Sequence, residues 1–331
     1  VGQWVGQTIL PDLLGVSVDK LYDKRLARAL DAIHPFLEEL WTYLVIQAVH
    51  QEEIDLSVLH WDTTTFYFEG EYSESELARY GHSSDGKPKC KQAKIGYDVT
   101  HIERLPFVYH LLAGQRTDVT LPVFNLNSIV DLLDRPELGR SKIHPLIVSD
   151  GKMVTRPLVA AAHDNDMYYL GPWEENKTVK AVLRSVSGAQ LAAHQLAYRP
   201  QRAVNDPDFE PYQAVWRPFS VTHNGQTFAD RGLVVWSEGN QRLDEEKRKH
   251  HLKALLNRLR QIQGYLNWGK YNSKKYAAQQ ILLAQRGNPA KALVDADLSG
   301  EDRALRLQFA INRQKLAEAI ALDGKYLLGT N

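Results

Sequence analysis

Strand-like and helix-like segments alternate in the first half of this chain, and their order limits the folds that it can adopt. The strand-like runs, rich in β-branched and bulky residues, are 58–68, 95–99, 107–112, 145–149 and 167–170. The helical runs between the later strands are 122–133 and 155–163. Three strands followed by helix, strand, helix and strand predict an α/β fold with a mixed sheet flanked by helices.

Further helical and strand-like segments lie on both sides of this pattern. Residues 20–48 predict two short amphipathic helices broken near Pro35, because apolar side chains recur at helical spacing. These side chains are Leu21, Leu26, Leu30, Ile33, Leu37, Leu40 and Leu44. After Gly171, alternating tryptophan-containing runs predict a second β-rich unit, followed by a long helix at 243–266.

The bulk composition excludes several classes of protein. With 40 basic and 40 acidic residues, the formal net charge is zero, so any nucleic-acid binding must come from local patches. Cys90 is the only cysteine, which excludes an internal disulfide framework and fits a cytoplasmic location. No apolar run reaches the roughly 20 residues that a membrane-spanning helix needs. The chain starts at Val1, so we expect it to be a piece of a longer reading frame.

Asp62 is unusual because it interrupts the strand-like run 59–66. Strand interiors disfavour aspartate, and no helix cap explains it. A second apolar run, 145–149, ends at Asp150. Carboxylates on separate strands can present oxygens to Mg²⁺, which takes one or two carboxylates and keeps waters or phosphate oxygens elsewhere. The two residues therefore predict a candidate metal site.

Both aspartates also have an ordinary structural interpretation. Asp150 precedes Gly151, and aspartate before glycine is a frequent turn former. His60 would face the same side of the strand as Asp62 and could support a metal ligand there, although a single histidine is commonly an ordinary packed or surface residue. Three further acids lie at strand edges, and spacing alone does not rank them below Asp150. They are Asp55, Asp98 and Asp118.

Four segments, in this order, together resemble the DDE transposases of bacterial insertion sequences, and within them the insertion-sequence-four superfamily. The segments are His60-Trp61-Asp62-Thr63-Thr64, Gly81-His82-Ser83-Ser84-Asp85-Gly86-Lys87-Pro88 running on to Lys91-Gln92, Leu105-Pro106 followed by Gly114-Gln115-Arg116-Thr117-Asp118, and Val148-Ser149-Asp150. The resemblance covers residues 20–331 in the same order. The combination is far more specific than any one segment.

The resemblance implies an RNase H-like catalytic core interrupted by a β-rich insertion. It implies Asp62 and Asp150 as catalytic ligands of Mg²⁺ or Mn²⁺, in a reaction that hydrolyses a phosphodiester at a transposon end and joins the freed 3′ hydroxyl to target DNA. The implied partners are double-stranded DNA and a second copy of the chain during the reaction. The implied domains are a helical segment 1–50, a core 51–170, an insertion 171–322 and a return strand 323–331.

The third metal-binding acid of the family has no match in this sequence. In the family it is a glutamate within a tyrosine, arginine, glutamate and lysine arrangement, and Glu238 and Glu245 match no part of it. A strand similar to 323–331 precedes that glutamate in the family, so we expect the chain to be truncated before it. The arrangement encoded within a few tens of codons after Asn331 would identify a transposase fragment, whereas an immediate stop codon would favour an inactive remnant.

Basic residues supply candidate DNA contacts. The expected DNA-binding residues are Lys87, Lys89, Lys91, Gln92 and Lys94, in and after a polar loop that adjoins the first two strands. A short basic run is also typical of a solvated loop, and the basic face of the long helix at 247–260 is typical of a solvated helix surface. Trp268, Tyr271 and Tyr276 beside three lysines are typical of single-strand binders or of packing within the insertion.

Three functions therefore remain after the sequence analysis. The first is the metal-dependent transposase, or a fragment of one. The second is a catalytically inactive DNA-binding or interaction protein that descends from a transposase, which the unmatched glutamate favours. The third is a metal-dependent nuclease of related fold, which the order of the segments and the large insertion disfavour.

Overall fold

A computed structural model describes most of the chain in two compact units. The described residues are 2–81, 86–87, 89–116, 121–139, 143–150, 153–201, 205 and 209–331. The first unit is Val1–Val148 and the second is Ser149–Asn331. Each unit is described by itself below. Asp118, His82–Asp85, Pro88, Thr117 and Gly151, which the sequence analysis singled out, lie outside the described residues.

The first unit begins with short helices. They are α1 (Gly2–Val5), α2 (Leu10–Leu14), the 3-10 turn η1 (Val18–Lys20), α3 (Asp23–Ile33), the 3-10 turn η2 (His34–Phe36) and α4 (Leu37–Gln51). The predicted break near Pro35 is confirmed, because Pro35 lies in η2 between α3 and α4. Proline lacks the N–H that would continue the helical ladder. The Nε1–H group of Trp41 on α4 donates to the backbone oxygen of Phe107, 3.1 Å away.

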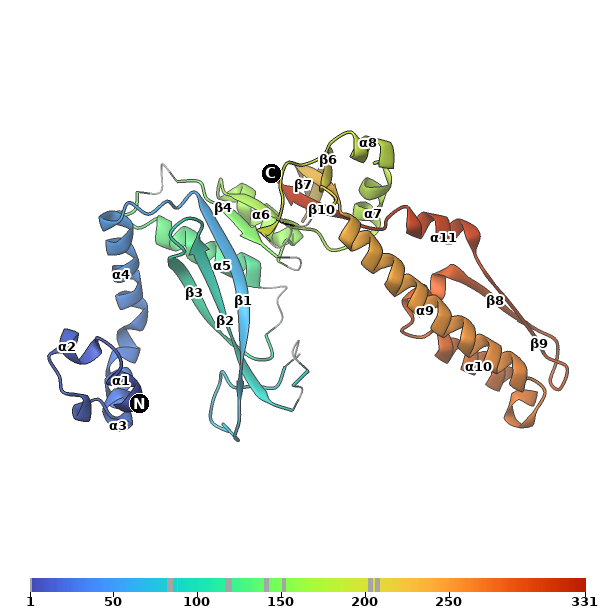
Figure 1. The fold of residues 1–331 in the computed structure, drawn as a ribbon, viewed down its shortest axis with the longest axis horizontal. Helices are drawn as coiled ribbons and strands as arrows, with labels where there is room; N and C mark the ends of the chain where they lie inside the picture. The colour runs from blue at the N-terminus through green and yellow to red at the C-terminus, as the bar shows by residue number, and fades with distance from the viewer. Residues whose placement is uncertain are drawn as a thin grey trace. The chain divides into compact units, whose positions relative to one another are not determined.

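The strands of the first unit occur along the chain in the predicted order. They are β1 (Val58–Phe68), β2 (Lys91–Thr100), β3 (Pro106–Ala113) and β4 (Leu146–Ser149), whose last residue belongs to the second unit. The strand order is β3-β2-β1-β4, and β1, β2 and β3 pair antiparallel. Helix α5 (Leu121–Leu133) packs on β3 (Figure 1). Strand β2 begins at Lys91, four residues before the predicted start.

Among its described residues, the first part of the second unit contains three helices and, with the last strand of the chain, four strands of a sheet. Helices α6 (Arg156–Asp164), α7 (Lys177–Arg184) and α8 (Gly188–Ala192) accompany strands β5 (Tyr168–Pro172), β6 (Gln213–His223), β7 (Gln226–Trp236) and β10 (Lys325–Thr330). The strand order is β5-β10-β7-β6, with antiparallel pairing throughout. Strand β10, the predicted return strand, therefore lies between β5 and β7, although it comes last in the chain.

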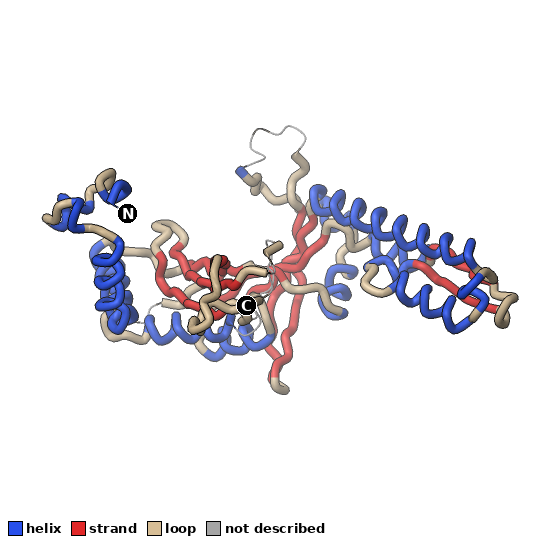
Figure 2. The backbone as a smooth tube through the Cα atoms, turned by 90° about the horizontal axis from the view of Figure 1, so that it is seen from below, coloured by secondary structure: helices blue, strands red, loops and turns tan. Residues whose placement is uncertain are grey.

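A separate hydrophobic core lies farther along the second unit. Its elements are α9 (Glu238–Tyr265), η5 (Gly269–Asn272), α10 (Lys274–Gln285), η6 (Pro289–Leu293), β8 (Val294–Ser299) and β9 (Arg306–Ile311), followed by α11 (Arg313–Ile320). The predicted stripe of α9 is confirmed, since Leu252, Leu255, Leu259, Ile262 and Leu266 are buried in this core and Leu256 packs against it. Figure 2 shows α9 and α10 beside the two strands β8 and β9.

The predicted class, an α/β fold with a large mixed sheet flanked by helices, is confirmed. The RNase H-like topology and the insertion domain stay predictions. Strands β6 and β7, which were expected in a second β-rich unit, join the same sheet as β5 through β10. No helix in the described part of the chain combines the length and apolar character that crossing a bilayer requires.

Candidate functional site

Asp62 lies on the open face of β1. Residues of β1 alternate between buried and accessible, so Leu59 and Trp61 face the interior while His60, Asp62 and Thr64 are exposed. This is the period-two alternation of a strand with one covered face. The carboxylate of Asp62 accepts a hydrogen bond from the backbone N–H of Thr63, at 2.7 Å from Oδ1. Asp62 therefore lies in the middle of the strand, but its carboxylate is exposed. The remaining acceptor positions of the carboxylate are available to a ligand.

Asp150 directly follows β4 and is also exposed. Its backbone oxygen accepts from the N–H of Met153 at 3.1 Å. Within the first unit, the N–H of Leu146 donates to the backbone oxygen of Ser57 at 2.8 Å. Strand β4 therefore starts beside the start of β1, and the two strands are neighbours in the sheet order.

Asp98 is not equivalent to Asp62 or Asp150, although spacing alone had not separated it from them. Asp98 lies opposite Trp61, and Asp62 lies opposite Tyr97, in the pairing of β1 with β2. Directly opposed residues project from the same face of a sheet, so Asp98 and Asp62 lie on opposite faces. The side chain of Asp98 is fully buried. It therefore cannot share a cation with Asp62.

A short polar chain surrounds Asp98 in the interior. Its Oδ1 accepts from Nδ2 of Asn125 at 3.1 Å, and Oδ1 of Asn125 lies 2.8 Å from Nε2 of His110. Burial raises the pKa of Asp98 well above its ordinary value, although the hydrogen bond from Asn125 lowers it. Burial also lowers the pKa of His110. Both conditions favour the neutral forms of the two side chains in this chain of hydrogen bonds.

Asp55 and His60 have local partners near the same strand. The two carboxylate oxygens of Asp55 accept from the N–H and the hydroxyl of Ser57, each at 2.8 Å, so Asp55 caps the turn into β1. Nε2 of His60 lies 2.8 Å from Nδ1 of His101, so one ring donates and the other accepts. Burial, and then the charge of His101, lower the pKa of His60. Sequence spacing did not indicate His101, because only the fold brings the two rings together.

The expected DNA-binding residues fall into two groups. Lys87 and Lys89 are exposed, and Nζ of Lys87 lies 5.0 Å from the ring centroid of Tyr67. Lys91, at the start of β2, donates from Nζ to the backbone oxygen of Tyr72 at 3.0 Å. Gln92 and Lys94 are buried. These two residues therefore lie in the interior rather than on a surface that DNA could reach.

Three residues from the segments that carry the resemblance meet at one place in the first unit. Nε2 of Gln92 donates to the backbone oxygen of Gly114 at 3.0 Å. A Cβ added to Gly81 would lie 2.0 Å from that same oxygen, and one added to Gly114 would lie 2.1 Å from the backbone oxygen of Gln92. Only glycine allows this approach of backbones. Part of the pattern that carries the resemblance is therefore a packing requirement of this fold.

Several acidic and basic residues of α9 pair with one another or with nearby residues. Glu238 pairs with Arg242, and Glu245 pairs with Lys249, each one helical turn apart. Such pairs along a helix surface contribute little to stability, but they account for Glu238 and Glu245 without a metal. Arg248 pairs with the buried Asp323. Two charges of the basic run, those of Arg248 and Lys249, are thus explained locally.

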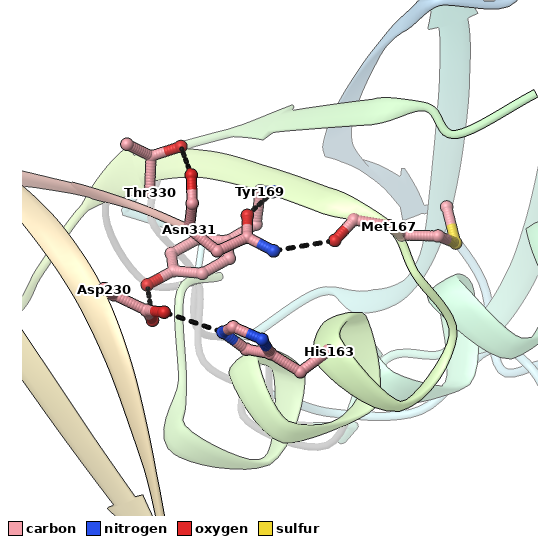
Figure 3. Close-up of polar contacts among 6 residues, drawn as sticks. All are labelled: His163, Met167, Tyr169, Asp230, Thr330 and Asn331. Carbon is pink, nitrogen blue, oxygen red and sulfur yellow. Dashed lines mark hydrogen bonds and ion pairs between the residues drawn. The ribbon is translucent and has the colours of Figure 1, made fainter.

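A buried polar cluster lies inside the second unit, where Figure 3 shows Asp230 between two partners. The carboxylate of Asp230 on β7 is 2.6 Å from Nε2 of His163 on α6 and accepts from the hydroxyl of Tyr169 on β5, also at 2.6 Å. The side chain of Asp230 is 0% exposed, whereas that of His163 is 29% exposed. The sequence did not indicate this cluster, because only the fold brings Asp230 together with His163 and Tyr169, which lie in a distant segment of the chain.

Among the described residues, no group of three or more histidine, cysteine, aspartate or glutamate side chains is arranged to hold a metal ion. Comparison of the sequence with models of protein families finds no match, and comparison with curated proteins finds none either.

Proposed function

We propose that the chain is a DDE-type DNA transposase, or a fragment of one, that uses Mg²⁺ or Mn²⁺ to hydrolyse a phosphodiester at an insertion-sequence end and to join that end to target DNA. The observation that carries the proposal is the placement of Asp62: an exposed carboxylate in the middle of β1, with β4 beginning beside β1. By the resemblance, β1 and β4 are the strands that carry the first two acids. An RNase H-like core is part of this proposal.

The donor set of the proposed site fits a hard divalent cation. Asp62 and Asp150 are both exposed, and carboxylate oxygens are the ligands that Mg²⁺ takes in small number. The N–H of Thr63 holds one oxygen of Asp62, which fixes the orientation of the carboxylate. When bound, the cations would activate the attacking oxygen and stabilise the leaving oxygen. The protein's own part is to hold the two carboxylates in place and to bind the DNA.

For the DNA contacts we retain Lys87, Lys89 and Lys91 from the expected set. Lys87 and Lys89 are exposed and Lys91 is half-buried, and each phosphate that these lysines neutralise would add a salt-dependent increment to affinity. Gln92 and Lys94 are left out because they are buried. Two transposon ends must be brought together in such a reaction, so we include a homodimer during the reaction, in the cytoplasm.

The first test is metal binding, which needs no knowledge of the DNA sequence. Mn²⁺ binding, followed by electron paramagnetic resonance, should be lost in Asp62→Asn and in Asp150→Asn. The matched control is Asp297→Asn, since Asp297 is also an accessible aspartate within a strand, β8. Mn²⁺ binding that both site variants retain in full would remove Asp62 and Asp150 from the proposed function.

The second test separates the transposase from its inactive descendant. A supercoiled plasmid carrying the DNA that flanks this coding region is incubated with Mg²⁺ and the protein as expressed from its full reading frame. Nicking by the wild type and by Asp297→Asn, but not by Asp62→Asn, is expected for the transposase. DNA binding with no nicking by any of the three proteins would instead support the non-catalytic alternative.

A further inference from the structure

Aromatic side chains gather where α9 ends and α10 begins, in the second unit. We define this aromatic tip as Tyr265, Trp268, Tyr271 and Tyr276. The rings of Tyr265 and Tyr271 are stacked, with centroids 5.7 Å apart and an interplanar angle of 27°. The rings of Tyr271 and Tyr276 meet edge to face at 5.1 Å. Three of the four aromatics therefore form one continuous set of rings.

The outer part of the aromatic tip is not core packing. Tyr271 packs against the hydrophobic core that α9 and α10 share. By contrast, Trp268 is 78% exposed and Tyr265 is 58% exposed. Tryptophan is usually well buried on average, so an indole this open is unusual. The inner ring thus anchors the set to the core, while two flat faces are left to solvent.

The charge around the aromatic tip favours an anionic partner. Lys270, Lys274 and Lys275 are exposed beside it, and among the described residues none of these lysines forms an ion pair. The carboxylate of Asp302 accepts from the backbone N–H of Lys274 at 2.8 Å, so this acid caps the start of α10 and leaves the ammonium group of Lys274 unpaired. Exposed rings and unpaired cations thus occupy one end of the helical pair.

We propose that the aromatic tip binds single-stranded DNA, with bases stacked on Trp268 and Tyr265 and phosphates neutralised by the lysines. Unpaired bases offer the flat faces that such rings accept, whereas a duplex keeps its bases stacked inside. A purely apolar partner surface would gain nothing from three unpaired lysines. The choice of DNA rather than RNA rests on the proposed function, since the breaking and joining of DNA ends exposes unpaired strands.

The experiment uses the whole chain and a fluorescently labelled single-stranded DNA of mixed sequence, with binding followed by anisotropy. Trp268→Ala should weaken binding about tenfold or more, and Tyr265→Ala by a similar factor, because each base stacked on an aromatic ring contributes on that scale. The matched control is Trp4→Ala, because Trp4 is 61% exposed in the first unit, away from the aromatic tip in sequence. The Lys270→Gln/Lys275→Gln double variant should reduce the dependence of affinity on salt.

Several outcomes would overturn the inference. Single-strand affinity of Trp268→Ala equal to that of Trp4→Ala would do so, as would equal losses for single-stranded DNA and for the duplex. Tighter binding of an RNA of the same sequence would remove the assignment to DNA. Mn²⁺ binding measured on the same variants separates the two proposals: Trp268→Ala should retain it, and Asp62→Asn should lose it while keeping single-strand affinity. Each proposal can therefore fail without the other.

Discussion

Asp98 lies directly opposite Trp61 in the pairing of β1 with β2, and this relationship places its carboxyl group in the interior of the first unit. Asn125 supplies a hydrogen bond to Oδ1, whereas Oδ2 has no hydrogen-bond partner among the described residues. Burying a charged carboxylate with one oxygen unpaired is costly, so the fold favours its protonated form. The pairing of two strands thus decides the chemistry of this acid.

This environment predicts a stability that falls as the pH rises. Burial raises the folded-state pKa of Asp98, while the unfolded chain ionises near the ordinary value of about 4. Below that value both states hold the proton and the stability is full. As the pH rises towards the folded-state pKa, only the unfolded state gains from ionisation, which lowers the free energy of unfolding by about 1.4 kcal/mol per unit of raised pKa.

Asp98→Asn keeps the oxygen that accepts from Asn125 and removes the ionisation. We expect the variant to gain stability over the wild type as the pH rises from about 4 to about 8, measured by urea unfolding at each pH. His110 is present in both proteins, so its own titration largely cancels in the difference. A difference between the two proteins that stays constant over this range would contradict the assignment of a raised pKa to Asp98.

Three aspartates inside strands show how far sequence reasoning reaches. Asp62 and Asp98 interrupt predicted strand-like runs, and Asp230 lies on β7, yet the first is exposed, the second is buried with a raised pKa, and the third is buried between two hydrogen-bonding partners. Residue type and spacing identify the strands of Asp62 and Asp98. They do not show which face is covered, because that depends on partner strands and helices from distant parts of the chain.

The helices and strands were more predictable from the sequence than the contacts between them. Periodicity alone predicts β1 from Val58 to Phe68 and the break between α3 and α4, because these signals are local. It does not predict that β10 lies between β5 and β7, nor the contact of His60 with His101, because both depend on how distant segments come together. The elements β8, β9 and α11 were not predicted either.

Exposed and buried lysines should differ in what their substitution does. The double substitution Lys87→Gln/Lys89→Gln should weaken duplex binding and reduce the slope of log K against log salt by up to about 0.9 for each phosphate that is no longer neutralised. It should leave the urea unfolding midpoint unchanged. Lys94→Gln should lower the urea unfolding midpoint and leave the salt slope unchanged, because Lys94 is buried and its Nζ donates to the backbone oxygen of Arg116 at 3.1 Å. A salt slope unaffected by the double substitution would remove the two exposed lysines from the proposed DNA contacts.

The close approach at Gly114 predicts a large effect from one methyl group. In Gly114→Ala the new Cβ would lie 2.1 Å from the backbone oxygen of Gln92, so the backbone must shift. We expect a loss of about 1–3 kcal/mol in the free energy of unfolding, as for other overpacked sites. The control is Gly264→Ala on α9, where nothing lies within 4 Å of the added Cβ. There alanine should stabilise the helix by up to about 1 kcal/mol, and equal effects at the two sites would contradict the packing argument.

The cluster around Asp230 predicts a stability loss when a single hydroxyl is removed. Burial, and then the hydrogen bond and charge of Asp230, raise the pKa of Tyr169, so its hydroxyl stays protonated and donates. In Tyr169→Phe one carboxylate oxygen of Asp230 loses its donor in the interior, which should cost about 1–3 kcal/mol in thermal or urea unfolding. Tyr168→Phe is the matched control, because the neighbouring Tyr168 is 50% exposed and its substitution should change stability by less than about 0.5 kcal/mol.

Combining Tyr169→Phe with Asp230→Ala should cost clearly less than the sum of the single changes, since both disrupt one hydrogen bond. Strictly additive losses would show that the hydroxyl and the carboxylate stabilise the fold independently.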